Sequence, residues 1–144
     1  MALAQDLAAV EALVARAYGP YVALLGVRPG PLDDDYAARI ERRQAMIVER
    51  DGRLMGLLVL IALSDALLLD NIAVSPEAQG LGLGRELLTC AEGVALARGL
   101  DRIRLYTHEL MTRNQMIYAR AGYRETQRAT ERGLRRVYME KRLR

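Results

Sequence analysis

The strongest constraint on this chain is a glycine-rich turn that joins an apolar segment to an amphipathic one. The apolar segment runs from Leu67 to Val74, and glycines then stand at alternate positions, Gly80, Gly82 and Gly84. An amphipathic segment follows at once, so we predict a strand that leads through a turn into a helix. Backbone N–H groups at the start of a helix lack partners, and the helix dipole favours an anion there. This turn is therefore a candidate phosphate-binding site.

The spacing of the turn excludes two common nucleotide-binding loops. A P-loop ends in Gly-Lys-Ser/Thr, whereas Gly84 is followed by Arg85 and Glu86. A Rossmann fingerprint needs its third glycine at position 85, where the arginine stands, and it normally follows the first strand of its unit. The remaining interpretations are a different phosphate ligand, or a glycine-rich helix start that binds nothing.

Length and composition predict one globular domain over residues 1–144. The length is that of one domain, and 51% of the residues are hydrophobic, which excludes disorder. No apolar run reaches about 18 residues, and the N-terminus carries Asp6 and lacks a basic region. We therefore expect neither a membrane span nor a signal peptide. The single cysteine, Cys90, excludes an internal disulfide and fits a reducing compartment, so we expect a cytoplasmic protein.

The net charge of +3 invites the hypothesis of a nucleic-acid partner. The basic residues gather in the C-terminal third, but Glu125, Glu131 and Glu140 interrupt them and few aromatic residues stand between them. We therefore expect a solvated basic edge and no nucleic-acid partner. The alternative is an arginine-rich interaction domain without a small-molecule function, and it predicts nucleic-acid binding that falls steeply with salt.

Hydrophobic periodicity predicts elements in the order α-α-β-β-β-α-β-α-β-β. The predicted helices cover residues 4–18, 36–40, 82–98 and 113–120, and the predicted strands cover residues 45–49, 54–63, 67–74, 102–107, 123–130 and 134–141. Residues 26–31 are expected to form a loop. Asp33–Asp35 is expected to cap the second helix, with an acidic lip for an amine substrate as the alternative. The strand–helix–strand unit should hold parallel strands, so the fold class is α+β, with a mixed, mostly antiparallel central sheet and flanking helices.

A second motif stands at the end of the last predicted helix, where Tyr118 is followed by Gly122 and Tyr123. Together with Gln79-x-x-Gly82-x-Gly84 and the Val-x-Pro before it, this motif resembles the GNAT N-acetyltransferase superfamily. That family has a Gln/Arg-x-x-Gly-x-Gly/Ala loop for acetyl-coenzyme A, and its last characteristic helix ends in Tyr-x-x-x-Gly-Phe/Tyr. The resemblance extends to the order of elements over essentially the whole chain. The family's usual first strand is missing, since only residues 1–3 precede the first helix.

The resemblance implies acetyl-coenzyme A (acetyl-CoA) as co-substrate and acyl donor. Its pyrophosphate would meet the loop backbone, which comprises Gln79, Gly80, Leu81, Gly82, Leu83, Gly84 and Arg85. The strand before the loop would offer its own backbone to the pantetheine arm, at Ile72, Ala73 and Val74. One of these N–H groups would also polarise the thioester carbonyl. No cluster of His, Cys and carboxylate residues has metal-ligand spacing, so we expect no metal.

Tyr118 is the candidate general acid, because a phenol within reach can protonate the coenzyme A thiolate that an attacking amine expels. Asn114 stands one helical turn earlier on the same face, where it could bind the pantetheine arm. Many family members carry this asparagine at the position that Met111 occupies here. The alternative for Tyr118 is a core position on an amphipathic helix.

An amine attacks only when it is neutral, so we also expect a general base. Asp70 is the first candidate, because it is polar in an otherwise apolar strand and other family members carry an ionisable base near this position. His108 and Glu109, just after the next strand, are the second candidates. The structural alternatives are an Asp70 that caps a neighbouring strand and a His108 bonded to the loop backbone. Cys90 is expected to pack and not to act as a nucleophile.

The sequence thus predicts an acetyl-CoA-dependent N-acetyltransferase that acts in a ternary complex on a primary amine of a small molecule or peptide. The alternative is a non-catalytic acyl-CoA-binding regulatory module, whose ligand binding would not depend on Tyr118. The acceptor pocket would be formed by residues 26–43 and the final hairpin, where no motif identifies the amine. Similar domains often form homodimers, so the resemblance leaves a homodimer open.

Overall fold

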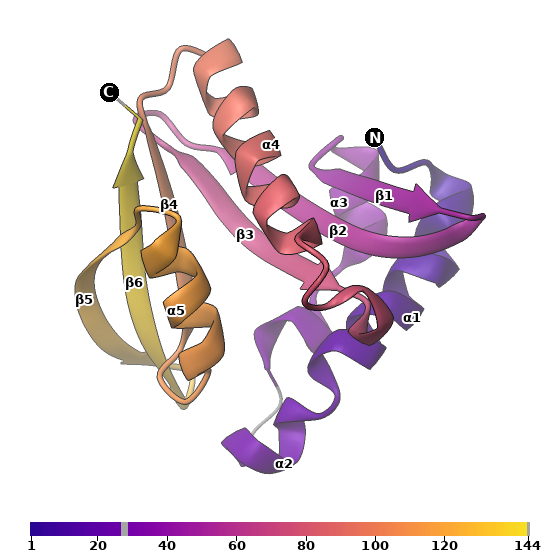
Figure 1. Ribbon diagram of the computed structural model, residues 1–144, viewed down its shortest axis with the longest axis horizontal. Helices are drawn as coiled ribbons and strands as arrows, with labels where there is room; N and C mark the ends of the chain where they lie inside the picture. Colours follow the sequence, from indigo (N-terminus) through magenta and orange to yellow (C-terminus); the bar gives the residue numbers. More distant parts are fainter. Residues whose placement is uncertain (27–28, 144) are drawn as a thin grey trace. The chain divides into compact units, whose positions relative to one another are not determined.

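The computed structural model describes residues 1–26 and 29–143, so Val27 and Arg28 of the predicted loop lie outside the described residues. It contains a six-stranded sheet in the order β1-β2-β3-β4-β6-β5 (Figure 1). The strands are β1 (Ala45–Arg50), β2 (Arg53–Ala62), β3 (Leu67–Val74), β4 (Arg102–His108), β5 (Arg124–Glu131) and β6 (Leu134–Arg142). The α-helices are α1 (Leu7–Tyr18), α2 (Tyr21–Leu25), α3 (Tyr36–Glu41), α4 (Leu83–Ala97) and α5 (Thr112–Arg120). Short 3-10 turns are η1 (Ala4–Asp6), η2 (Gly30–Asp33) and η3 (Pro76–Ala78).

The predicted α+β class with a mixed, mostly antiparallel sheet and flanking helices is confirmed. Strands β3 and β4 are parallel, as expected for the strand–helix–strand unit, whereas the β1–β2, β4–β6 and β5–β6 pairs are antiparallel. The sequence pattern does not predict α2. This short helix forms because Pro20 already has a helical φ of −59° at its start and Gly26 ends it at a φ of 71°.

The chain divides into two compact units. The first unit comprises residues 1–60 and 71–87, and the second comprises residues 61–70 and 88–144. The chain passes from one unit to the other inside β2, β3 and α4. The prediction of a single domain over residues 1–144 stays a prediction. None of the helices within the described ranges has the length and apolar character that a membrane span needs.

In the first unit, β1 and β2 form a hairpin around Asp51 and Gly52, whose φ angles are 55° and 74°. Positive φ at both central residues is the type I′ turn that Asp-Gly favours, so the predicted hairpin is confirmed. Gly56 on β2 faces the first turns of α4. A Cβ there would lie 3.2 Å from Leu87 Cδ1 and 3.3 Å from Leu83 Cδ2, so the missing side chain lets the helix start lie close to the strand.

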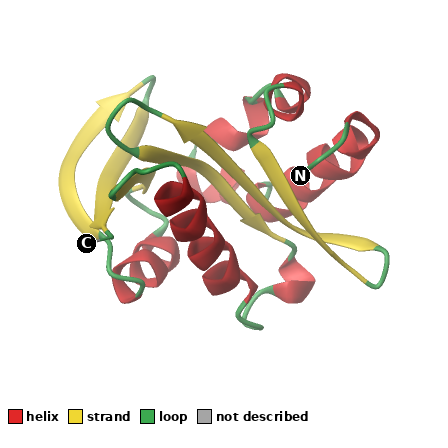
Figure 2. Cartoon of the chain, turned by 90° about the horizontal axis from the view of Figure 1, so that it is seen from above, coloured by secondary structure: helices red, strands yellow, loops and turns green. Residues whose placement is uncertain are grey.

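In the second unit, β3 pairs with β4 over Leu67–Leu69 and Ile103–Leu105, and β6 lies between β4 and β5. The register of β5 against β6 shifts between Glu125 and Gln127. A bulge of this kind bends a strand pair, and Figure 2 shows the final hairpin as a strongly curved ribbon near the C-terminus. Helix α5 ends before Gly122, which has a φ of 100°, as the predicted helix stop requires.

Candidate functional site

The glycine turn lies between β3 and α4, as predicted, and all of it belongs to the first unit. Gly80 and Gly82 have φ angles of 84° and 86°, which other residues adopt only with strain. Nothing lies within 4 Å of the place where a Cβ would stand on either glycine, and Leu81 between them is 71% exposed. The turn is therefore open backbone that a ligand can approach closely.

Helix α4 begins directly after the turn and leaves its first N–H groups available. Its first i→i−4 hydrogen bond is donated by Glu86 N–H to the Gly82 carbonyl at 3.1 Å. The N–H groups of Leu83, Gly84 and Arg85 precede that bond, so the helix offers them no carbonyl. The helix dipole adds partial positive charge at the same place. Arg85 is exposed and forms no ion pair with any described residue, so its charge is added to that of the helix start.

Contacts on the strand side hold the turn in place. The Gln79 side chain donates from Nε2 to the Val74 carbonyl at 3.3 Å, which closes the turn on the end of β3. Ser75 N–H donates to the Met55 carbonyl on β2 at 2.8 Å. The Ser75 hydroxyl is buried and has no hydrogen-bond partner among the described residues. The glutamine of the motif thus contacts the chain itself and anchors the turn.

The predicted pantetheine-binding residues form the last part of β3. Ala73 is buried, whereas Ile72 and Val74 are half-buried. These residues lie beyond the last registered pair of β3 with β4, which joins Leu69 to Leu105. Their carbonyls are already contacted inside the first unit: that of Ile72 accepts a hydrogen bond from the Tyr18 hydroxyl at 2.8 Å, and that of Val74 accepts from the Gln79 side chain.

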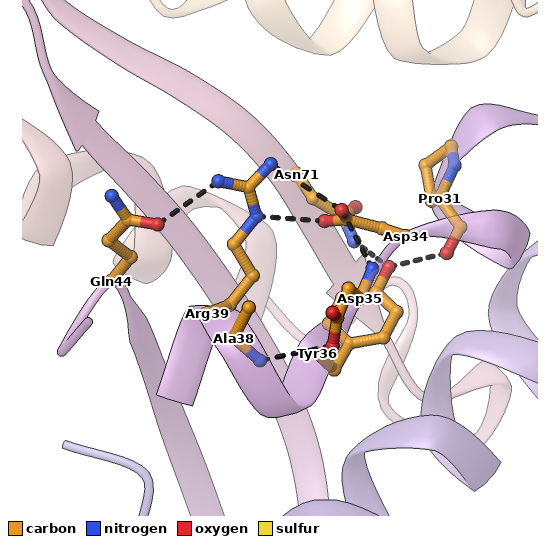
Figure 3. Close-up of polar contacts among 8 residues, drawn as sticks. All are labelled: Pro31, Asp34, Asp35, Tyr36, Ala38, Arg39, Gln44 and Asn71. Atoms are coloured by element: carbon orange, nitrogen blue, oxygen red, sulfur yellow. Dashed lines mark hydrogen bonds and ion pairs between the residues drawn. The ribbon is translucent and has the colours of Figure 1, made fainter. Parts of the chain in front are cut away.

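A buried polar network, absent from the sequence prediction, meets β3 beside these residues. Asn71 is only 4% exposed. The single proton of the Tyr18 hydroxyl is shared between the Ile72 carbonyl and Asn71 Oδ1, which lies 2.7 Å away, and Asn71 Nδ2 donates to the Tyr36 hydroxyl at 2.9 Å. The Tyr36 hydroxyl in turn donates to the Pro31 carbonyl at 2.5 Å (Figure 3). The signal in the sequence was a second polar residue in an apolar strand, next to Asp70.

The acidic triplet caps helix α3, as predicted. Asp35 Oδ1 accepts a hydrogen bond from Ala38 N–H at 3.1 Å, and Figure 3 shows this cap at the start of the helix. Asp34 forms an ion pair with Arg39 at 3.0 Å, and Arg39 also donates to Gln44 Oε1 at 3.0 Å. The N-cap role is therefore confirmed, and Asp34 is occupied by a partner within the same unit.

Tyr118 lies near the end of α5, in the second unit, and is 6% exposed. Its ring makes an edge contact with the ring of Tyr123, with 6.0 Å between the centroids. Burial raises the pKa of the Tyr118 hydroxyl well above its ordinary value, so the phenol keeps its proton at neutral pH. Burial, and secondarily the charge of Glu92, raises the pKa of the Tyr123 hydroxyl in the same direction.

The second unit also holds Asp70 and Asn114, both half-buried. Asn114 lies one turn before Tyr118 on α5, as predicted. Alternation along β3 places the Asp70 side chain on the face opposite to that of Leu69 and Asn71. The glycine turn and the end of β3 thus belong to the first unit. The candidate acid Tyr118, the candidate base Asp70 and Asn114 belong to the second.

The second-choice base candidates have partners of their own. His108 Nδ1 accepts a hydrogen bond from Leu110 N–H at 3.0 Å, so the proton of the neutral ring is on Nε2. Burial lowers the pKa of His108, with a smaller lowering from Arg135 and an opposing contribution from Glu109. With its one lone pair engaged, His108 is a poor base, and its bond to the loop backbone is the structural alternative foreseen from the sequence. Among the described residues, no group of three or more His, Cys, Asp or Glu side chains could hold a metal ion.

Comparison with known proteins gives one family. Residues 10–123 match the model of the acetyltransferase (GNAT) family. A mycothiol acetyltransferase from Beutenbergia cavernae is 42% identical over 52 residues, which are 36% of this chain and 18% of that protein. The match therefore spans less than a fifth of the length of this curated relative.

Two solved structures are similar over nearly the whole chain. The PaiA N-acetyltransferase from Thermoplasma acidophilum, in complex with coenzyme A, gives a TM-score of 0.81 at 19% identity, over 98% of this chain and 95% of that chain. The ribosomal protein S18 alanine N-acetyltransferase from Escherichia coli gives a TM-score of 0.79 at 19% identity, over 99% and 90% of the two chains. At these identities the likeness concerns the fold.

The Tyr123 hydroxyl gives a prediction about stability. It is buried and has no hydrogen-bond partner among the described residues, and such a group costs about 1–3 kcal/mol. Tyr123→Phe should therefore leave the free energy of unfolding unchanged or raise it, as measured by urea denaturation. Tyr18→Phe is the matched comparison, because it removes a buried hydroxyl that has two acceptors, and it should lower that free energy. Equal losses in the two variants would show that Tyr123 has a partner.

Proposed function

We propose, since the chain belongs to the GNAT acetyltransferase family, that it transfers acetyl from acetyl-CoA directly to a primary amine of a small molecule or peptide. The transfer would occur in a ternary complex, without an acyl-enzyme. The observation that carries this proposal is the open glycine turn at the start of α4, with its available N–H groups. The single cysteine, Cys90, supports a reducing, cytoplasmic location as part of the proposal.

The residues of the turn fit the pyrophosphate of coenzyme A. Gly80 and Gly82 leave the space above the backbone open, and the N–H groups of Leu83, Gly84 and Arg85 supply donors at the positive end of a helix. The Arg85 guanidinium adds a full positive charge. The backbone of Ile72, Ala73 and Val74 would then pair with the amides of the pantetheine arm, while Gln79 keeps the turn closed on β3.

Acetyl-CoA supplies a thioester, whose C–S bond breaks as the amine nitrogen forms a bond to the carbonyl carbon. The departing thiolate needs a donor, and we assign this role to Tyr118, which keeps its proton at neutral pH. An ordinary thiol has a pKa of about 8.5, well below that of a buried phenol. Tyr118 would therefore stabilise the thiolate mainly through a hydrogen bond, and a proton that it passes to the thiol would be replaced by the proton that the amine releases.

The amine must lose a proton, and we assign its removal to Asp70, directly or through a water molecule. His108 is the weaker choice because its Nδ1 lone pair is engaged by Leu110 N–H. Asn114, one helical turn before Tyr118, is proposed to contact the pantetheine arm. With these roles the acid and the base come from different elements, α5 and β3, and do not compete for one proton.

Gly82→Asp should abolish acetyl-CoA binding, because the carboxylate would fill the space of the pyrophosphate and repel it. At about 100-fold excess over Kd, acetyl-CoA should stabilise the unsubstituted protein by about 2.7 kcal/mol, a rise of several degrees in Tm. The variant should show no rise.

Gly52→Asp is the matched control, since Gly52 also has a positive φ of 74° and open space around it, and it should keep the rise. A normal rise in Gly82→Asp would put the phosphate site elsewhere, and no rise in the folded, unsubstituted protein would contradict the proposed function.

Tyr118→Phe separates the enzyme from a non-catalytic acyl-CoA-binding module. The change removes one hydroxyl and keeps the ring, so kcat should fall by roughly 10²–10⁴ while acetyl-CoA affinity changes little. The loss should be smaller with a thioester whose thiol is a better leaving group. The measurement is thiol release over a panel of primary amines, with Tyr123→Phe as the control expected to keep its turnover. Unchanged turnover in Tyr118→Phe would remove it as the donor, and equal losses on both thioesters would assign it a positioning role.

A further inference from the structure

One buried side chain of the first unit is joined to both of the segments that the proposed reaction needs. Asn71 stands in β3 immediately before Ile72, and its amide uses both of its polar atoms. Its oxygen accepts from Tyr18, and its nitrogen donates to Tyr36. An amide that is 4% exposed is costly to bury unless it is bonded, so these contacts hold the side chain in one orientation.

The Tyr18 branch of this network acts on the strand proposed to bind the acyl donor. The Tyr18 hydroxyl lies 2.7 Å from Asn71 Oδ1 and 2.8 Å from the Ile72 carbonyl oxygen, and its one proton serves both acceptors, so Asn71 helps to hold this hydroxyl beside the Ile72 carbonyl. A peptide group is planar, so holding the Ile72 carbonyl also sets the direction of the N–H of Ala73. Tyr18, at the end of α1, thereby fixes the orientation of the peptide group between Ile72 and Ala73. That orientation decides where the strand directs the N–H and carbonyl groups that pantetheine could bind.

The Tyr36 branch acts on the chain before α3. The Tyr36 hydroxyl accepts from Asn71 and donates to the Pro31 carbonyl at 2.5 Å, so it holds the turn η2 to the start of α3 (Figure 3). Tyr36 itself is 4% exposed, which leaves its ring little freedom. Pro31 lies in the segment 26–43, where the resemblance places one side of the acceptor pocket. The amide of Asn71 therefore bonds to Tyr18, which holds the strand proposed to bind acetyl-CoA, and to Tyr36, which holds the turn at Pro31 in the expected acceptor segment.

We propose that Asn71 is a positioning residue of the acetyl transfer. This inference rests on the proposed function. Through Tyr18, Asn71 fixes the backbone that meets acetyl-CoA. Through Tyr36, it transmits the ordering of that backbone to the turn at Pro31. Ordering one end of a shared network lowers the entropic cost of ordering the other, which couples the two binding sites. Acetyl-CoA binding should therefore make residues 29–36 less mobile before any amine binds.

The test uses acetyl-CoA alone and four variants of the full chain. The readouts are the Kd of acetyl-CoA by calorimetry and the amide hydrogen exchange of peptides within residues 29–36 with saturating acetyl-CoA. Asn71→Leu keeps the size of the side chain and removes both bonds, while Tyr18→Phe and Tyr36→Phe each break one branch. Val10→Ala, a buried position on α1 outside the network, is the control for general loss of stability.

The two branches should give different results. Tyr18→Phe and Asn71→Leu should raise Kd by about threefold to tenfold, the range that one hydrogen bond supports. Tyr36→Phe should leave Kd within about twofold of the unsubstituted value. In the unsubstituted protein and in Val10→Ala, acetyl-CoA should slow exchange in residues 29–36, and in the three network variants this slowing should be lost at saturation.

Several outcomes would overturn the inference, and they differ from those that test the proposed function. If the unsubstituted protein binds acetyl-CoA but Asn71→Leu and Tyr18→Phe bind it equally well, Asn71 does not position the Ile72–Val74 backbone. If Tyr36→Phe keeps the slowing of exchange, the turn is not coupled through Asn71. If Val10→Ala, at a Tm equal to that of the network variants, also binds acetyl-CoA more weakly, the weaker binding reflects a general loss of stability and not the network. Should Asn71→Leu fail to fold, the two tyrosine variants decide, and absence of binding in the unsubstituted protein would contradict the proposed function and this inference together.

Discussion

The chemistry proposed for this chain depends on backbone N–H groups that a helix cannot satisfy by itself. At the start of α4 these belong to Leu83, Gly84 and Arg85, and the first helical bond comes only with Glu86. Such donors must meet water, a cap or a ligand. Two glycines with positive φ keep the approach to them clear, and the absent side chain at Gly56 lets the helix start lie against β2. The same local features therefore fix the position of the helix and leave its positive end open to an anion.

A rigid strand next to this helix start is the second requirement, because backbone pairing with a ligand works only if the backbone directions are set beforehand. The chain meets this requirement with buried polar groups in an otherwise apolar strand. Asn71 would destabilise the fold if it were unpaired, and Tyr18 and Tyr36 provide the bonds that prevent this. In contrast, the buried hydroxyls of Ser75 and Tyr123 have no partner among the described residues. Buried polar groups thus stabilise β3 where they are hydrogen-bonded, and they lower the stability of the protein where they have no partner.

Local signals were enough to predict most of the fold. The Asp51-Gly52 turn, the helix stop at Gly122 and the glycine turn itself each depend on the dihedral preferences of one or two residues, which the sequence states directly. Helix α2 was missed because its five residues carry no periodic pattern. The Asn71 network was missed because its partner Tyr18 lies 53 residues away, and no pattern along the chain brings them together. In contrast, the bond that makes His108 a poor base is local, because it comes from the N–H of Leu110 two residues later, and such a loop-backbone bond was foreseen from the sequence as the alternative for His108.

A crystal structure of the full chain with coenzyme A would test the central claim most directly. The pyrophosphate oxygens should lie about 2.7–3.2 Å from the N–H nitrogens of the turn and helix start, between Gly80 and Arg85. The pantetheine arm should run along the backbone of Ile72–Val74, with the Tyr18 hydroxyl still on the Ile72 carbonyl. Coenzyme A bound at another surface, with the glycine turn left to solvent, would contradict this account of the chain.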